Sequence, residues 1–522
     1  MRRKIRTHHY RSMTTPAFAP LHPLDEHNLK LESNVHPRDW VNPTPDGKYN
    51  LVVMGAGTAG LVAAAGSAGV GAKVALIERD LLGGDCLNVG CVPSKAIIAS
   101  AHAAASARNT ERFGVHVPEG VTVDFAGAME RMRKLRADIS PHDSADRFKG
   151  LGIDVFLGPA KFTGPNTIEV NGQELTFAKA VVATGARASA PPIDGLDGVE
   201  YLTNEMLFSL TELPKRFGIV GAGPIGAEMA QTFARFGSEV TLFTGRSGML
   251  PKEDPEAGAL VAAELERDGV TIKDFGSDLL LSKNDDGTIS IWKKGEDSDG
   301  AIVVDKLLIA VGRAPNVSGL GLEEAGVKFD LKTGVQVDDN LRTTNKNVFA
   351  AGDVCSAFKF THAADFMARN VIRNALFGGK AKTSDLVIPW ATYTTPEVAH
   401  VGPTRDDLEA RKDELDLYRV NMGSVDRAIL EGETDGFVKI YTEKGKDTIV
   451  ASTIVSKNAG DLISQVSQAM VAGVGLGKIG ATISPYPTQG EAIRKAGDLY
   501  AKTRLTPFVA KLLKKWLAFQ IR

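Results

Sequence analysis

Cys86 and Cys91 lie five positions apart in the segment GGDCLNVGCVPSK, which runs directly into an alanine-rich stretch. Two thiols at this spacing can form and break a disulfide, which makes them a two-electron redox pair. Pro93 and Ser94 suit the first turn of a helix, so we expect Cys91 near the positive end of the helix dipole, where a thiolate is stabilised. Lowering a thiol pKa from about 8.5 to below 7 takes roughly 2 kcal/mol, which is about the most that a helix terminus supplies.

Two other interpretations of the cysteine pair carry less weight. A structural disulfide that closes so short a loop would stabilise the fold by only about 2 kcal/mol. A zinc site would need further ligands, and no Cys or His cluster with ligand spacing accompanies the pair. Cys355, the third cysteine, is expected to be a small buried residue without chemistry. Redox chemistry is therefore the leading interpretation.

A nucleotide-binding unit precedes the cysteines. The run LVVMGAGTAGLVAAAGSAGVGAKVALIERD, which starts at Leu51, predicts a strand, a glycine turn, a helix and a second strand. Gly55, Gly57 and Gly60 would supply the tight turn, the close backbone approach to a pyrophosphate and close helix packing. Glu78 ends the second strand, where its carboxylate can accept hydrogen bonds from ribose hydroxyls.

The same pattern returns in FGIVGAGPIGAEMAQTFARFGSEVTLF, where Gly221, Gly223 and Gly226 hold the equivalent positions. Two dinucleotides are therefore expected. The second strand of this unit ends in FTGR, without the carboxylate that would hold the ribose of NAD. The missing acid and the nearby Arg246 and Lys252 favour the 2′-phosphate of NADPH. A surface role for these two cations, with NADH as donor, stays open.

The bulk composition narrows the class of protein. A chain of 522 residues is expected to form two or three domains, and 43% hydrophobic residues suit an ordinary soluble fold. A formal net charge of -2 disfavours nucleic acid as a partner. Three cysteines are too few for a secreted disulfide framework, and no run of about 18 apolar residues is present. These features favour a cytoplasmic location.

These motifs, taken together, resemble the flavoprotein disulfide reductases, the class I pyridine nucleotide-disulfide oxidoreductases. The family includes dihydrolipoamide dehydrogenase, glutathione reductase and mercuric reductase, and the general sequence is most similar to the mercuric reductase-like proteins. The resemblance covers residues 50–503. Its motifs are GGDCLNVGCVPSK, VVATGA with Gly185, DKLLIAVGRAPN with Gly312, VFAAGDV with Gly352 and Asp353, and PWATYTTPEVAHVG, which is similar to the opening of the dimerisation domain.

The resemblance implies an α/β fold with two Rossmann-like dinucleotide-binding domains, for FAD and NAD(P)H, plus a C-terminal α+β dimerisation domain. It also implies a homodimer in which each dimerisation domain completes the partner's active site. The expected segments are an N-terminal extension at 1–48, FAD-binding segments at 49–190 and 315–385, an NAD(P)H domain at 191–314, a dimerisation domain at 386–503 and a tail at 504–522.

The same resemblance implies a path for electrons. They would pass from NADPH through FAD to Cys91, which opens the disulfide and frees Cys86 for the substrate. Asp353 is the expected ligand of the FAD ribityl chain. Lys95 and Glu228 match positions that flank the flavin and nicotinamide in relatives, and ordinary helix-surface roles are the alternative for both.

The segment ISPYPTQGEAIRK departs from the family pattern. Disulfide reductases of the family usually carry a His-Pro-Thr motif followed by Glu, in which the histidine moves the proton of the attacking thiol. Tyr486 stands at the histidine position and Glu491 is retained. A tyrosine titrates near 10, so it is a poor proton shuttle at pH 7. Mercuric reductases share this tyrosine, whereas their C-terminal cysteine pair and N-terminal CxxC domain are both missing here.

Both ends of the chain fall outside the resemblance. The first 24 residues are basic and superficially suit a transit peptide, and Met13 is an alternative start that would remove most of the basic residues. Residues 14–48 hold six prolines, which predicts an extended arm. The tail TPFVAKLLKKWLAFQIR has apolar and basic residues at helical spacing. It predicts a helix docked on the dimer in preference to contact with a membrane surface.

The sequence therefore predicts an NADPH-dependent, FAD-containing reductase of a soft metal ion or another thiol-reactive acceptor. Dihydrolipoamide dehydrogenase, or a reductase of small disulfides, is the alternative. A non-catalytic redox sensor is a remote third interpretation, because a sensor has no need of two complete dinucleotide motifs.

Overall fold

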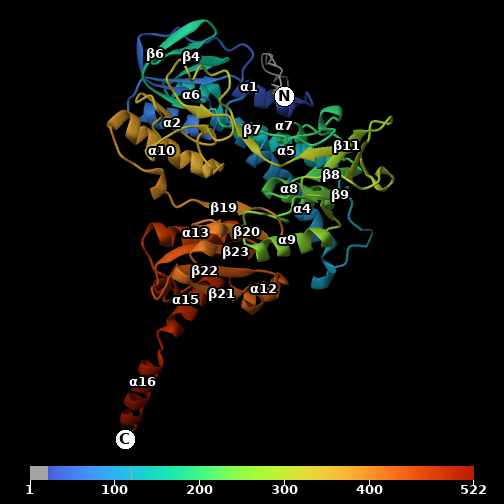
Figure 1. Cartoon of the computed structure of the whole chain (residues 1–522), viewed down its shortest axis with the longest axis vertical. Helices are drawn as coiled ribbons and strands as arrows, with labels where there is room; N and C mark the ends of the chain where they lie inside the picture. Colours follow the sequence, from blue (N-terminus) through green and yellow to red (C-terminus); the bar gives the residue numbers. More distant parts are fainter. Residues whose placement is uncertain (1–20, 119, 522) are drawn as a thin grey trace, which may run out of the picture.

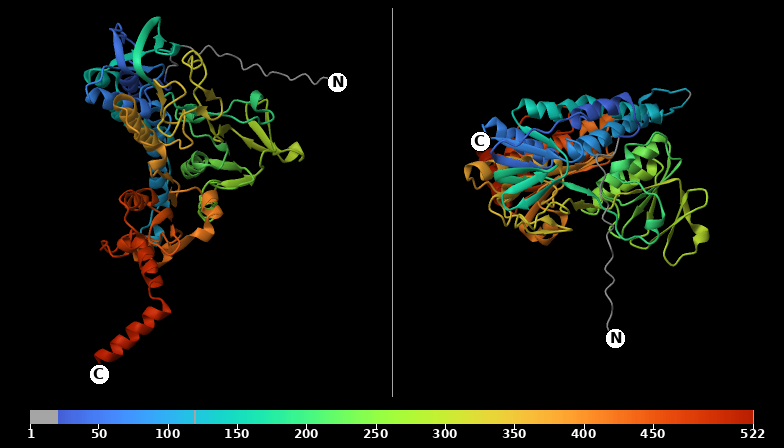
Figure 2. Two further views of the ribbon diagram at one scale, coloured as in Figure 1. Left: turned by 60° about the vertical axis from the view of Figure 1, so that its left-hand side comes forward. Right: turned by 90° about the horizontal axis from the view of Figure 1, so that it is seen from above.

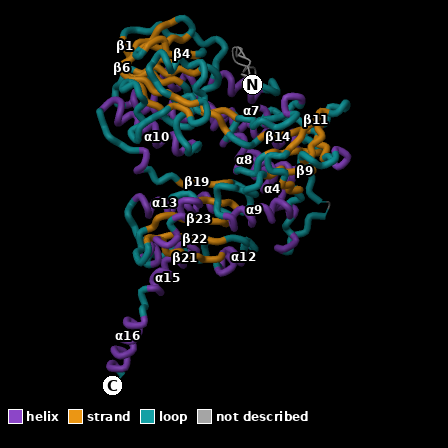
Figure 3. Tube along the Cα trace, viewed as in Figure 1, coloured by secondary structure: helices purple, strands orange, loops and turns teal. Residues whose placement is uncertain are grey.

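The computed structural model describes residues 21–118 and 120–521. The basic residues before position 20 and Met13 lie outside this range. Figure 1 shows two mixed α/β parts above a C-terminal part, with the last helix projecting away from it. Figure 3 shows that both strands and helices contribute to each of these three parts, so the predicted fold class is confirmed.

The first part is a seven-stranded sheet built around the predicted nucleotide unit. The strand order is β3-β2-β1-β6-β5-β4, with β18 added parallel to β6 from far along the chain. Strand β1 pairs in parallel with both β2 and β6. The strands are β1 (Lys48–Met54), β2 (Val74–Glu78), β3 (Asp154–Leu157), β4 (Ala160–Gly164), β5 (Thr167–Val170), β6 (Gln173–Val182) and β18 (Val348–Ala350).

Helices cover this sheet and carry the residues with chemistry. Helices α2 and α10 pack against each other, and α4 packs against α5 and α8. Alanine and glycine on α2 allow the backbones to approach closely. The helices of this part are α2 (Thr58–Gly69), α3 (Gly84–Asn88), α4 (Cys91–Arg108), α5 (Phe125–Ile139), α6 (Ala145–Gly150) and α10 (Thr361–Phe377).

The second part has a parallel sheet in the order β10-β9-β8-β14, beside a three-stranded antiparallel sheet β11-β12-β13. Strands β7 (Ala186–Ala188) and β15 (Arg313–Pro315) pair where the chain enters and leaves this part. Its other elements are α7 (Asn204–Leu207), β8 (Arg216–Val220), α8 (Pro224–Phe236), β9 (Glu239–Thr244), α9 (Pro255–Arg267), β10 (Thr271–Asp274), β11 (Leu279–Lys283), β12 (Ile289–Lys293), β13 (Ile302–Val304) and β14 (Lys306–Ile309).

The C-terminal part is a five-stranded antiparallel sheet in the order β19-β20-β23-β22-β21, covered by helices. A short hairpin, β16 (Phe329–Asp330) and β17 (Gly334–Val335), precedes this sheet in the chain. The elements of the C-terminal part are β19 (Pro389–Thr392), β20 (Glu397–Val401), α11 (Arg405–Ala410), β21 (Leu415–Asn421), α12 (Asp426–Glu431), β22 (Phe437–Glu443), β23 (Ile449–Ser456), α13 (Ala459–Val471), α14 (Leu476–Gly480) and α15 (Glu491–Thr503).

One hydrophobic core joins all three parts at helix α4. Ile97 and Ile98 of α4 are buried in the same cluster as Phe233 of α8 and Phe437 of the C-terminal sheet. Phe125 of α5 packs its ring 5.9 Å from that of Phe233. Because this packing fixes α4 between the other parts, it also fixes the position of the cysteine at its N-terminus.

The N-terminal region corrects one prediction. Residues 26–35 form helix α1 (Glu26–Val35) in place of an extended arm. No proline lies between Pro23 and Pro37, so a helix can form there. Asp25 caps it by accepting a hydrogen bond from the Asn28 amide at 2.8 Å. The helix packs on α5, where Arg136 donates to the Asn28 side chain at 2.6 Å. Composition alone could not reveal this docking site.

Candidate active site

Glycines create the turn that carries the two cysteines. Cys86 lies on the short helix α3, and Cys91 is the first residue of α4, as expected. Gly83 and Gly84 adopt positive φ angles of 88° and 56°. A Cβ at Gly90, between the two cysteines, would lie 2.8 Å from the Asp85 carbonyl oxygen. The sequence GGDCLNVGC therefore folds into a compact turn that brings both sulfurs to one place.

Two helix N-termini meet at the Cys91 sulfur. Cys91 begins α4, Thr361 begins α10, and the Sγ and Oγ1 atoms of these residues are 3.3 Å apart. The Cys86 thiol donates a hydrogen bond that, with Thr361 and the charge of Lys95, lowers the pKa of Cys91 to about 6. The same contact and burial raise the pKa of Cys86. In the reduced pair Cys91 therefore holds the negative charge and Cys86 the proton.

Lys95 and Glu228 form an ion pair one helical turn beyond Cys91. Their Nζ and Oε2 atoms are 2.9 Å apart, and Glu228 is buried. The other Glu228 oxygen accepts a hydrogen bond from the Tyr393 amide at 3.0 Å. The Lys95 Nζ also lies 4.4 Å from the centre of the Tyr393 ring. The two residues thus belong to one contact between α4, α8 and the C-terminal part, in which Glu228 is buried and Lys95 half-buried.

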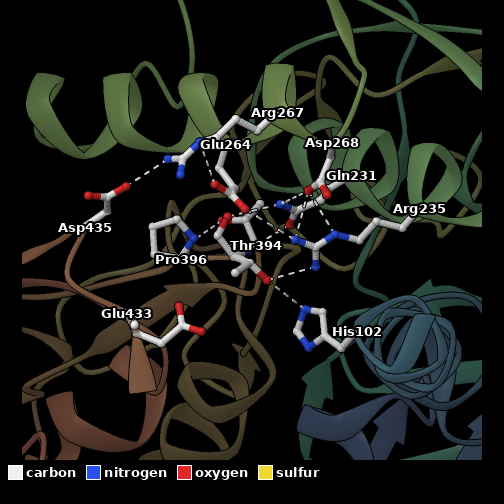
Figure 4. A network of polar contacts seen from close by, with 12 residues as sticks. His102, Gln231, Arg235, Glu264, Arg267, Asp268, Thr394, Pro396, Glu433 and Asp435 are labelled. Carbon is white, nitrogen blue, oxygen red and sulfur yellow. Dashed lines mark hydrogen bonds and ion pairs between the residues drawn. The ribbon is translucent and has the colours of Figure 1, made fainter. Parts of the chain in front are cut away.

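A second polar contact, three to seven residues further along α8, joins the same three parts (Figure 4). The Gln231 side chain accepts from the Thr395 amide at 2.7 Å and donates to its carbonyl oxygen at 3.0 Å. Arg235 donates to the Thr395 hydroxyl at 2.9 Å, and His102 of α4 lies 3.2 Å from that hydroxyl. Asp268 accepts from both Gln231 and Arg235. We call Gln231 and Arg235 with Thr395 the α8 clamp.

The first glycine turn has the shape of a pyrophosphate cradle. Gly55 has a φ of 102°, and a Cβ at Gly60 would lie 1.8 Å from the Gly55 carbonyl oxygen. Gly57 caps α2, so the helix amides at this end are open to an anion. Glu78 ends β2 as predicted, and its carboxylate accepts from the amides of Ala56 at 2.7 Å and Asp80 at 2.9 Å. These residues fit a bound FAD.

The expected ribityl ligand lies beside the cysteine turn. Asp353 is next to Arg313, whose Nε is 3.5 Å from the Asp353 carboxylate, and burial raises the pKa of Asp353. Arg313 also binds the Asp85 carboxylate and the Ala186 carbonyl oxygen, yet its buried Nε has no hydrogen-bond acceptor within the described chain. Gly352 has a φ of 80°. An unmet buried donor beside Asp353 fits a polar group of FAD.

The second glycine turn repeats the first. Gly221 has a φ of 109°, and a Cβ at Gly226 would lie 1.7 Å from the Gly221 carbonyl oxygen. Gly223 caps α8, which brings the anion-binding end of this helix and the buried Glu228 onto one element. Strand β9 ends at Thr244, and the cations Arg246 and Lys252 that follow it are exposed. Gly185 and Gly312 lie beside the paired strands β7 and β15.

Tyr486 lies between α14 and α15, and Glu491 begins α15, which Figure 1 shows in the C-terminal part. Tyr486 is 71% exposed, and its hydroxyl donates to Asp426 at 2.8 Å, which raises its pKa. Glu491 begins α15, where it contacts Arg494 at 3.3 Å. Such a placement suits residues that act on a partner subunit.

Three residues of the site escaped the sequence analysis. Thr361, Tyr393 and Arg313 touch Cys91, Lys95 and Asp353 across long separations in the chain. Tyr393 and Arg313 lie inside two of the family motifs, PWATYTTPEVAHVG and DKLLIAVGRAPN, which could have marked them as site residues. No local sequence pattern marks Thr361. Cys355 is half-buried, and burial raises the pKa of its thiol to about 12.

The described residues show neither a metal site nor a membrane-spanning helix. Among residues 21–118 and 120–521, no group of three or more His, Cys, Asp or Glu side chains is arranged to hold a metal ion. In the same part of the chain, no helix is both long enough and apolar enough to cross a membrane.

Family models match nearly all of the folded chain. Residues 49–368 match the pyridine nucleotide-disulphide oxidoreductase model, and residues 388–497 match the dimerisation domain of the same family. The chain belongs to this family. Its members contain FAD and take electrons from NAD(P)H, so this protein is a flavoprotein oxidoreductase. The dimerisation domain indicates a homodimer.

Individual relatives differ in activity. The mercuric reductase of Streptomyces lividans is 34% identical over 89% of this chain and 98% of its own. The dihydrolipoyl dehydrogenase of Bacillus subtilis is 33% identical over 86% and 96%. The HOCl-induced flavoprotein disulfide reductase RclA from Escherichia coli, solved as a Cu(II) complex, is similar with a TM-score of 0.76 and 28% identity over 87% of this chain and 100% of its own. The family is thus shared by reductases with unlike acceptors.

Proposed function

We propose that this flavoprotein is an NADPH-dependent reductase that delivers electrons through Cys86 and Cys91 to a soft metal ion or another thiol-reactive acceptor. The observation that carries the proposal is the low pKa of Cys91, together with a tyrosine of raised pKa, Tyr486, at the position where disulfide reductases usually carry the histidine that moves the proton. A metal ion that binds thiolates does not need such a shuttle. The mercuric reductase relatives and the Cu(II) complex of RclA support the same class of acceptor.

The residues of the chain divide the chemistry between them. When bound, NADPH supplies a hydride and FAD carries its two electrons to the cysteine pair. The two helix N-termini, Thr361 and Lys95 stabilise the Cys91 thiolate. Cys86 keeps its proton until an acceptor arrives. A Hg(II) ion that binds both sulfurs would displace that proton, because thiolates are the ligands that soft metals prefer.

The exposed cations after β9 support NADPH as the donor. No carboxylate ends β9, and Arg246 and Lys252 have no ion-pair partner within the described chain. Arginine and lysine are suited to a 2′-phosphate. Arg246→Ala with Lys252→Ala should therefore lower kcat/KM for NADPH by about tenfold and leave that for NADH within about twofold. An equal loss with both donors would contradict this preference.

The proposal is tested by steady-state NADPH oxidation with FAD-loaded protein. Thiol-buffered Hg(II), Cu(II), lipoamide and glutathione disulfide would be compared as acceptors. We expect turnover with a metal ion that disappears in the Cys86→Ser, Cys91→Ser variant and survives in the Cys355→Ser control. Turnover with lipoamide or glutathione disulfide alone would overturn the proposal in favour of a disulfide reductase. No turnover with any acceptor would point to a redox sensor.

A further inference from the structure

Helix α16 (Pro507–Gln520) extends away from the rest of the chain, as the left view in Figure 2 shows. None of its residues is buried. Thr506 caps the helix by accepting from the Val509 amide at 3.3 Å, and Pro507 occupies its first turn. The helix predicted for the tail is therefore present, and within the described part of the chain nothing buries any of its side chains.

Apolar and basic side chains occupy opposite faces of α16. At 3.6 residues per turn, Lys511, Lys514 and Lys515 share one face. The opposite face is formed by large apolar side chains that are at least 46% exposed, which are Phe508, Leu512, Leu513, Trp516, Leu517 and Phe519. Individual exposed apolar residues are ordinary, whereas a whole exposed face marks an interaction site.

The charge of the tail has one sign. Asp498 is the last acidic residue, and every charged side chain after it is Lys or Arg. Lys502 and Arg504 precede the helix and add to the charge of its basic face. An acceptor surface must therefore offer negative charge along the helix and an apolar layer next to it. An anionic lipid surface has both, because its phosphate groups border its acyl chains.

We propose that α16 binds the surface of an anionic membrane and lies in the plane of the headgroups. A helix of 14 residues is about 21 Å long, which is shorter than the roughly 30 Å of a bilayer's hydrocarbon core, so it lies on the membrane and does not cross it. Phe508, Trp516 and Phe519 enter the boundary with the acyl chains. The lysines on the other face reach the phosphates through their flexible stems.

Two other occupants fit less well. A nucleic acid would engage the lysines but leave the aromatic and leucine side chains in water. A second copy of the chain, the occupant that the sequence analysis favours, would cover the apolar face and leave the lysines in water, so it would not account for the single sign of the charge after Asp498. A lipid surface satisfies both faces at once. The enzyme body stays in water beside the membrane, joined to α16 by residues 504–506.

The test is flotation of the FAD-loaded full-length dimer with lipid vesicles. The wild-type protein should float with vesicles of equal parts phosphatidylglycerol and phosphatidylcholine, and far less with phosphatidylcholine alone. Each Lys→Gln change at 511, 514 or 515 should lower the partition coefficient by about fivefold. High salt should weaken binding in the same direction. Trp516 fluorescence should shift to the blue on binding, and a Trp516→Phe variant should lose that shift.

A matched variant separates amphipathic binding from charge alone. Leu513→Lys combined with Lys514→Leu keeps the composition and net charge of the helix but breaks the separation of its faces. It should lose most vesicle binding while NADPH oxidation stays at the wild-type rate. Unchanged binding by this variant, or by a chain ending at Thr503, would overturn the proposal. So would absence of vesicle binding combined with a loss of dimer stability on truncation, which would place α16 on the partner subunit.

Discussion

At the scale of single residues, the charge of Cys91 is set by its neighbours. Because its pKa is lowered to about 6, the thiolate forms as the pH rises through 6 and is nearly complete at neutral pH. Removing the Thr361 hydroxyl in Thr361→Val should raise this midpoint by about one pH unit, the value of one hydrogen bond to a charge. The ultraviolet absorbance of the thiolate in the reduced protein reports the titration.

Cys355 supplies the control for this titration. Burial raises the pKa of its thiol to about 12, so Cys355→Ser should leave the curve unchanged below pH 9. Cys91→Ser should remove the acidic step altogether. A midpoint near 8.5 in the wild-type protein would mean that the helix termini and the Cys86 hydrogen bond do not stabilise the thiolate.

Gly60 makes the closest approach in the first nucleotide cradle. A Cβ there would lie 1.8 Å from a backbone oxygen of Gly55, which no side-chain movement can relieve. Gly60→Ala should therefore yield protein with little or no FAD, measured as the ratio of flavin to protein absorbance. Gly69 ends the same helix and has open space around its Cα, so Gly69→Ala should retain full FAD content. Equal FAD content in both variants would show that the turn does not hold the cofactor.

Substitution of Tyr486 can test why a disulfide acceptor is disfavoured. Its hydroxyl donates to Asp426, and the resulting raised pKa keeps it protonated at every pH at which the enzyme is expected to work. Tyr486→His would introduce a group that titrates near 6.5. Lipoamide reduction by this variant should rise on the order of tenfold or more over the wild-type rate, with a bell-shaped pH profile. A flat response would indicate that proton transfer does not limit disulfide turnover here.

At the scale of elements, the α8 clamp ties three parts of the molecule together. Gln231→Leu leaves the Thr395 amide and carbonyl without their partners, which should lower the free energy of unfolding by about 2 to 4 kcal/mol. Urea unfolding of the FAD-loaded protein measures the change. Gln336 is exposed and makes no side-chain hydrogen bond within the described chain, so Gln336→Leu should stay within about 0.5 kcal/mol. A similar loss of unfolding free energy in both variants would show that the α8 clamp does not stabilise the fold.

Local sequence patterns predict some elements well and others poorly. The strand that ends at Glu78 and the helix that begins at Cys91 follow from glycine turns and hydrophobic runs of fixed spacing. Helix α1 was missed because its docking on α5 depends on Arg136, more than 100 residues away. Thr361 and the α8 clamp were missed for the same reason. Their partners are set by the assembled fold, which no local motif encodes.

At the scale of the whole molecule, the dimer is expected to build each active site from two chains. Cys86 lies on α3 and Cys91 begins α4, whereas Tyr486 and Glu491 belong to the C-terminal part, just before and at the start of α15. Because the dimerisation domain indicates a homodimer, we expect a site that needs both sets to take them from different subunits. Dimers that combine two different variant chains can therefore show whether each active site is shared between subunits.

The decisive mixture combines Cys91→Ser chains with chains that carry Tyr486→Ala and Glu491→Ala. If the site is shared, each mixed dimer contains one intact site, formed by the cysteines of the second chain and the Tyr486 and Glu491 of the first. Random pairing of equal amounts makes half of the dimers mixed, so about one quarter of the sites should be intact. NADPH oxidation by the mixture should then exceed the mean of the two parent dimers by about one quarter of the rate that Tyr486→Ala with Glu491→Ala removes from the wild-type dimer. Activity equal to the mean would mean that each chain completes its own site.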